Sequence, residues 1–180
     1  MKMNWNCREF KITKYDSIKD YEENHISSIE IHHGNMITNN GLLAMWALAM
    51  GYNGTKFIIQ ENPEVSITPH AFTAYTNDST PCSKIAIGND STSEDGTSTT
   101  ISNPLGLLNV TSISASQSDN RSTITFTAEA GVDTAVGEWN EWGIYDIENG
   151  ILFNRKVESM GNKRATSIWK VEIKIDLIRS

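Results

Sequence analysis

The sequence predicts an all-β protein: a mainly antiparallel β-sandwich or flattened barrel with one short buried helix near residues 40–50. Residues 169–177 alternate strictly between apolar and polar side chains, which is the period of a strand with one buried and one solvated face. Shorter alternations recur between clusters of Gly, Asn, Asp and Ser. One-sided burial in many short strands is typical of antiparallel sandwiches and barrels.

The β-favouring segments predict about eight strands. In chain order they span 26–33, 56–60, 84–88, 108–116, 121–130, 142–147, 151–157 and 169–177. Asn149-Gly150 predicts a hairpin turn between the sixth and the seventh of them. The side chains expected to line the core are Ile124, Phe126, Trp142, Ile144, Trp169, Val171, Ile173 and Ile175.

The predicted helix begins after Thr38-Asn39-Asn40-Gly41, which offers N-cap side chains. Its sequence, LLAMWALAM, is built mostly from strong helix formers, and Gly51 can end it. Because the segment is apolar nearly all the way round, we expect the helix to be buried against a sheet or a neighbouring chain.

The length of 180 residues favours one domain, which we place at 26–180, preceded by an N-terminal arm at 1–25. Phe10 and Ile12 alternate with Lys11 and Thr13, so the arm contains one strand. Two interpretations stay open. The strand docks on the domain's own sheet or on a neighbouring subunit as an arm, or it is the first strand buried in its own sandwich.

The net charge of −7 argues against nucleic-acid binding, which needs a basic surface. The N-terminus has no signal-peptide pattern, and the longest apolar run, 42–50, is about half the length that a bilayer requires. We therefore expect a soluble protein made in a cytoplasm, with no membrane partner.

Residues 60–83 hold three of the four prolines and are predicted to form a long irregular loop. Residues 89–104 form a polar, acidic surface loop in which Asp90, Glu94 and Asp95 are calcium-type ligands. The EF-hand order of ligands is absent, so a solvated loop is expected, and calcium binding by 89–97 is left open.

The spacing typical of metal ligands is absent among the four histidines, His25, His32, His33 and His70. Neither a metal site nor a cofactor is predicted.

The segment GEWNEWGIYD at 137–146 places Glu138 and Glu141 between tryptophans. A glycosidase needs two carboxyl groups about 5–9 Å apart, but residues three apart on a strand point to opposite faces. We expect Trp142 and Ile144 to fill the core while Glu141 caps a turn or pairs with a neighbour such as Arg155. No nucleophile elbow, P-loop or dinucleotide-binding motif is present, so no catalytic residue and no enzymatic activity are predicted.

Five segments occur in a specific order: HHGNMITNNGLLAMWALAMG, SKIAIGNDSTSEDGTSTTISNPL, STITFTAEAGVDTAVGEWNEWGIYD, GILFNRKVE and KRATSIWKVEIKIDL. This order resembles that of a widespread group of small virion proteins of tailed bacteriophages. Their pattern has an N-x-I/V-T-x-x-G-L opening, an IAIG strand, F-x-A leading to W-x-E-W/G, then G-x-L-x-R and GTK…W. Gly161-Asn162-Lys163 replaces the GTK element here, and the resemblance covers about residues 32–178.

The resemblance implies a non-enzymatic structural component of a bacteriophage virion, with a capsid decoration or accessory protein on the particle exterior as the leading expectation. The alternatives are a tail, baseplate or fibre-attachment subunit, or a carbohydrate- or receptor-binding module that takes a host-surface glycan. Expected partners are major capsid or tail proteins and further copies of the chain. The candidate residues for contacts with other virion proteins are Trp5, Phe10, Ile12, Phe72, Tyr75 and Trp139. In the glycan-binding alternative, the aromatic rings that could stack on a sugar are those of Trp5, Tyr52, Phe72, Tyr75 or Trp139.

Overall fold

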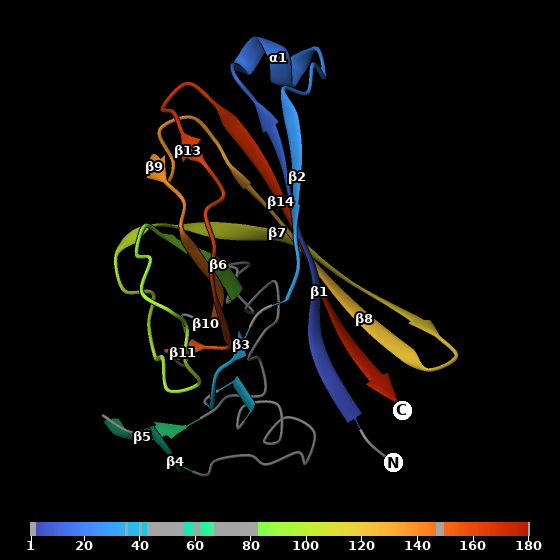
Figure 1. Cartoon of the computed structure of the whole chain (residues 1–180), viewed down its shortest axis with the longest axis vertical. Coiled ribbons are helices and arrows are strands. Elements are labelled where there is room, and N and C mark those ends of the chain that lie inside the picture. Colours follow the sequence, from blue (N-terminus) through green and yellow to red (C-terminus); the bar gives the residue numbers. More distant parts are fainter. Residues whose placement is uncertain are drawn as a thin grey trace.

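The computed structural model describes residues 3–34, 36–39, 41–42, 56–59, 62–66, 83–146 and 150–179. Its main feature is a ten-stranded sheet with the order β2-β1-β14-β8-β7-β6-β10-β12-β3 and with β11 paired to β10 off this path (Figure 1). Every recorded strand pair is antiparallel. The predicted all-β class is therefore confirmed.

The elements run in chain order as β1 (Met3–Tyr15), α1 (Ile18–Glu22), β2 (Ser28–His32), β3 (Met36–Ile37), β4 (Lys56–Ile59), β5 (Asn62–Ser66), β6 (Ser83–Gly88), β7 (Pro104–Ser118), β8 (Arg121–Ala130), β9 (Gly137–Glu138), β10 (Glu141–Asp146), β11 (Ile151–Leu152), β12 (Asn154–Val157), β13 (Asn162–Lys163) and β14 (Ile168–Arg179). Two further pairs, β9 with β13 and β4 with β5, form separate two-stranded sheets.

Strand β7 folds the large sheet into two parts because it changes partner along its length. Residues 104–109 pair with β6, and residues 110–118 pair with β8, with a register shift between Val110 and Ser112. A strand that passes from one sheet to another at a bulge forms the corner of a sandwich. We call β2, β1, β14, β8 and the end of β7 the first half-sheet, and the start of β7, β6, β10, β12 and β3 the second. In Figure 1, β7 crosses between them.

The core lies between the two half-sheets. Phe10 of β1 stacks on Trp142 of β10 with ring centroids 4.3 Å apart, and Trp139 meets Trp169 of β14 edge to face at 4.8 Å. Aromatic pairs add to area burial when they stack or meet edge to face in this way. The expected core residues found in this cluster are Phe126, Trp142, Ile144, Trp169, Val171, Ile173 and Ile175.

Ile124 corrects the expected core, because 40% of its surface is exposed. It lies near the start of β8, opposite Ile175 of β14. This end of β8 belongs to the hairpin that extends away from the second half-sheet in Figure 1. The alternation in sequence placed Ile124 on the inward face, but burial also requires a second layer opposite that face.

The strand in the N-terminal segment is paired within the large sheet. Strand β1 lies between β14 and β2 and pairs with both, and its Phe10, Ile12 and Tyr15 are buried. This pairing favours the second of the two open interpretations, a first strand within the domain, and the boundary at residue 25 stays a prediction. Helix α1, which was not predicted, follows directly: the Ser17 side chain accepts a hydrogen bond from the Asp20 N–H, and the Ser-x-x-Asp pattern of 17–20 resembles a capping box.

The start of the one helix that the sequence predicted is present. Asn39, Gly41 and Leu42 have helical geometry, the Thr38 hydroxyl accepts from the Gly41 N–H at 3.0 Å, and the Leu42 N–H donates to the Thr38 carbonyl. Residues 43–50 lie outside the described residues. The region 60–83, predicted to be irregular, contains β5. In the described part of the chain, no helix is long and apolar enough to cross a membrane.

Candidate functional site

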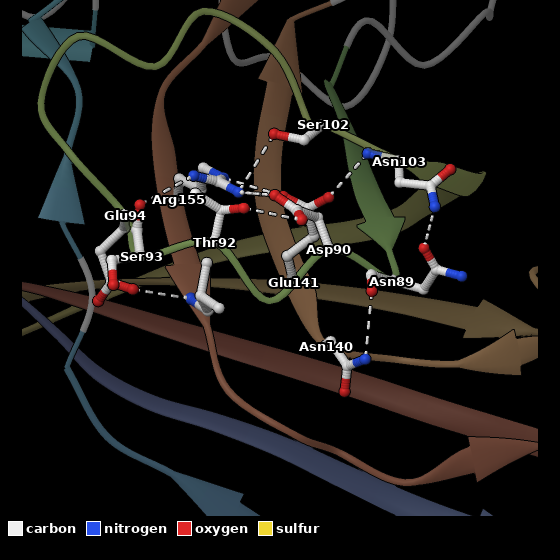
Figure 2. A network of polar contacts seen from close by, with 11 residues as sticks. Asn89, Asp90, Thr92, Ser93, Glu94, Ser102, Asn103, Asn140, Glu141 and Arg155 are labelled. Atoms are coloured by element: carbon white, nitrogen blue, oxygen red, sulfur yellow. Dashed lines mark hydrogen bonds and ion pairs between the residues drawn. The ribbon is translucent and has the colours of Figure 1, made fainter.

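A buried ion pair lies where β10 begins beside β12 (Figure 2). Glu141 is fully buried, and its Oε2 accepts hydrogen bonds from Nε and Nη2 of Arg155 at 2.9 and 2.8 Å. Two N–H groups of a planar guanidinium on one carboxylate make a strong, charge-assisted contact. The pairing of Glu141 with Arg155 that the sequence suggested is confirmed.

Arg155 also binds the loop formed by residues 89–103, which we call the 89–103 loop. Its Nη2 donates to Asp90 Oδ2 at 3.1 Å and to Ser102 Oγ at 3.3 Å, and its Nη1 donates to the Ser93 carbonyl at 3.5 Å. One buried guanidinium thus holds both ends of the loop. Its hydrogen bonds offset the cost of removing a charge from water, which is large for an unpaired ion.

The other oxygen of Glu141 and a second carboxylate complete the attachment of the loop. Glu141 Oε1 accepts from the Asn103 N–H at 3.1 Å, and Glu94 Oε2 accepts from the Val157 N–H at 3.1 Å. Asn103 also donates through its side chain to Asn89. Figure 2 shows these polar contacts between the loop and the two strands. We call this set the Glu141 network.

The acidic loop is therefore folded onto the sheet instead of being fully solvated, because Asp90 and Glu94 each have a partner in β12. Asp95 instead binds the N–H and hydroxyl of Thr97 within the loop, at 2.7 and 2.6 Å. The three carboxylates that resembled calcium ligands thus have three different sets of protein partners. Across the described residues, no group of three or more His, Cys, Asp or Glu side chains is arranged to hold a metal ion.

The contacts of Asp90 lower the pKa of its carboxyl group. Desolvation favours the neutral acid, but hydrogen bonds from Thr92 and Ser102 and the charge of Arg155 favour the carboxylate and outweigh it. The pKa therefore lies below the ordinary value of 3.8. For Asp95, the hydroxyl and N–H of Thr97 lower the pKa in the same way.

The lowered pKa predicts the pH at which Asp90 stabilises the fold. The contribution of Asp90 to the free energy of unfolding is complete above its unfolded-state pKa. It is lost as the pH falls through the lower, folded-state pKa. Asp90→Asn should therefore lower the melting temperature modestly at neutral pH, and the difference from the unsubstituted protein should shrink below about pH 4. Thermal melts from neutral to acid pH measure this, and a difference that does not change with pH would contradict it.

Gly88 is the last residue of β6 and lies next to Glu141 of the network. A Cβ atom at this position would overlap Glu141 Oε1 and lie 2.5 Å from Ile101 Cγ2 and 2.8 Å from the Asn103 carbonyl oxygen. Only glycine lets the loop residues approach the strand so closely. The sequence showed the IAIG segment but not this reason for its glycine.

Gly88→Ala is expected to lower the free energy of unfolding by about 1–3 kcal/mol, since the added methyl group must displace the backbone or the buried carboxylate. Gly131→Ala is the matched control, because no heavy atom of the described residues beyond its two chain neighbours lies within 4 Å of a Cβ built there. Urea denaturation of both variants measures the effect. Equal stability of the two would show that the contact at Gly88 relaxes without cost.

A second set of polar contacts connects the first half-sheet to the segment after β12. Lys14 Nζ donates to Glu30 Oε1 and to the Met160 carbonyl, both at 2.6 Å, and lies 4.2 Å from the ring centroid of Trp169. His32 Nδ1 is 3.1 Å from Glu158 Oε1. These contacts join β1 and β2 to the segment after β12. Sequence reasoning did not find them, because the partners are up to 146 residues apart.

Lys163, in β13, is fully buried without a carboxylate at contact distance among the described residues. Its Nζ donates to the carbonyls of Gly131 and Ser167 at 2.8 and 2.9 Å. Burial lowers the pKa of its amine, and the charge of Asp133 partly opposes this shift. Lys163 thereby fixes two turns to each other, which is a structural role.

Two hollows lie beside the 164–167 turn. One, of about 250 Å³, is polar and includes Lys14, Asn162 and Arg164; the other, of about 410 Å³, includes Ile18, Val132 and Ala165. Lys14 is already bound to Glu30 and Met160. Among the described residues that line these hollows there is no cysteine or histidine.

Three of the candidate interface residues are core residues. Phe10, Ile12 and Trp139 are at most 1% exposed. Phe10 stacks on Trp142 of the second half-sheet. Trp139, just before β10, packs edge to face on Trp169, and its indole N–H donates to the Ala135 carbonyl. The side chain of Trp5 and residues Tyr52, Phe72 and Tyr75 lie outside the described part. Glu138 is exposed in β9 while Glu141 is buried, so the two carboxylates face different environments.

Fold and site together define a class: an antiparallel β-sandwich module whose surface loop is held by a buried ion-pair network. A scan against protein-family models finds no match to the chain, and searches of curated proteins and of solved structures find none either.

Proposed function

We propose that this chain is a non-enzymatic structural component of a tailed-bacteriophage virion, located on the exterior of the head as a decoration or accessory protein. The observation that carries the proposal is the composition of the Glu141 network. Its members fall within three of the segments that resemble the virion proteins, namely 83–105, 122–146 and 150–158.

The structural roles of these residues give a reason for the same sequence pattern to recur among virion structural proteins. Glu141 and Arg155 hold the loop, Gly88 makes room for it, and Lys163, the lysine of the element that resembles GTK, holds two turns. Each role concerns the fold and not a reaction. The agreement supports a shared architecture with the virion proteins, and the assembly role follows from that resemblance.

A building block of a particle needs surface for its neighbours, and the candidates now differ from those the sequence suggested. Large apolar side chains that are exposed in the described part include Ile18, Ile29, Ile31, Leu107 and Val136. These replace Phe10, Ile12 and Trp139 as candidate contacts with capsid proteins or further copies. The carbohydrate-binding alternative loses Trp139 as a stacking platform, since that ring is buried.

Immunogold labelling and mass spectrometry of purified particles test the proposal. We expect the chain to be present in intact particles at many copies and the label to lie over the heads. Label confined to tails would overturn the decoration role and favour the tail or fibre-attachment alternative. Absence of the chain from purified particles would overturn the virion role altogether.

A further inference from the structure

Strand β2 is one end of the ten-stranded sheet, and several features that commonly protect such an edge are missing from it. Within the described residues it pairs with β1 alone, in a continuous register from Phe10↔His32 to Lys14↔Ser28. Natural edge strands are commonly protected by lysine, proline, a bulge or shortness. The sequence of β2, SIEIH, contains neither lysine nor proline, and its pairing shows no register shift. The opposite end, β3, has only two residues.

The two faces of β2 differ in a way that favours pairing. Ile29 and Ile31 are each 50% exposed on one face. On the other face, Glu30 binds Lys14 at 2.6 Å, and His32 lies 3.1 Å from Glu158. Glu30 and His32 therefore each have a partner within their own chain, while two isoleucine side chains remain partly in water.

We propose that two copies of this chain pair through β2, antiparallel and about a two-fold axis at Glu30. This register places Ile29 opposite Ile31 of the second copy, and Ser28 opposite His32 of the second copy, because the axis passes through the central residue of the strand. The four isoleucines then form one apolar cluster on a sheet that continues through both copies. The two Glu30 side chains meet with their charges compensated by Lys14.

A symmetric pair is favoured over a head-to-tail contact by the lengths of the two edges. Joining β2 of one copy to β3 of the next would pair only two residues, whereas β2 offers five to its own copy. An isologous contact of this kind closes after two subunits. The inference concerns the purified chain in solution and does not rest on the virion role, so its failure and the failure of that role are seen in separate experiments.

Light scattering coupled to size-exclusion chromatography tests the pairing over a dilution series. We expect a mass twice the 20.0 kDa of the chain that falls towards the single-chain mass on dilution. The double variant Ile29→Lys, Ile31→Lys should be a monomer throughout, with an unchanged circular-dichroism spectrum. Leu107→Lys is the control, because Leu107 is 49% exposed on a different strand, and it should still pair. A protein that is monomeric at every concentration, or a dimer that persists in the double lysine variant, overturns the proposal.

Cysteine cross-linking tests the register. In the double variant Ile29→Cys, Ile31→Cys, each new thiol lies opposite one on the second copy, at a separation that a disulfide can span in directly opposed strand residues. Oxidation should convert this variant to a covalent dimer, and the unsubstituted protein, which keeps Cys7 and Cys82, should show no such product. Ile29→Cys alone and Ile31→Cys alone should not cross-link through β2. Efficient cross-linking of either single variant would overturn the register centred on Glu30.

Discussion

A chain that begins at residue 25 is expected not to fold. The truncation removes β1, which lies inside the first half-sheet between β14 and β2, and with it the buried Phe10, Ile12 and Tyr15. Burial of Phe10 and of Ile12 contributes about 1.5–3 kcal/mol each, and two strands also lose a hydrogen-bonded neighbour. A domain has only about 5–15 kcal/mol of stability in total. Circular dichroism should show loss of the β spectrum and of a cooperative thermal transition.

The matched control is Lys11→Ala, which changes the same strand on its other face, between the buried Phe10 and Ile12. It should fold and melt close to the unsubstituted protein, because surface substitutions usually change stability by less than about 0.5 kcal/mol. If the truncated chain instead folded with the native spectrum and melting temperature, β1 would be dispensable. The interpretation of residues 1–25 as a separate docking arm would then be the better one.

Removing one partner of the Glu141–Arg155 pair is expected to cost about 3–5 kcal/mol, since it leaves the other charge buried and only partly compensated. In Arg155→Met, the fully buried Glu141 carboxylate keeps only the Asn103 N–H among its two recorded partners. In a domain of this size each kcal/mol shifts the melting temperature by roughly 2–4 °C. The variant should therefore melt roughly 6–20 °C lower.

A double-mutant cycle with Glu141→Leu, Arg155→Met and their combination isolates the interaction. The double variant should lose less stability than the sum of the two single variants, because replacing both charges with apolar side chains leaves neither ion unpaired. Urea denaturation gives the three free energies of unfolding. Strict additivity would show that the pair contributes no coupling, and that the 89–103 loop is held by its other contacts.

The alternating pattern of the sequence determined the strands and most of the core. Trp169, Val171 and Ile173 share one face of β14 and are buried as that pattern predicted, since a strand with one dry face must place apolar side chains at every second position. The short distance along the chain between Glu141 and Arg155 also made their pairing predictable, since two adjacent antiparallel strands bring such residues together.

Only the tertiary structure decided which strands meet and where the inner faces are covered. The insertion of β1 between β2 and β14 joins residues at opposite ends of the chain, and period two in a sequence does not specify a neighbour. The partner change along β7 decides that Phe10 and Trp139 are core while Ile124 stays exposed. An alternating strand establishes that one of its faces is apolar. Whether that face is buried depends on a second layer of structure opposite it. In this protein the second layer is brought there by β7, which changes from pairing with β6 to pairing with β8 along its length.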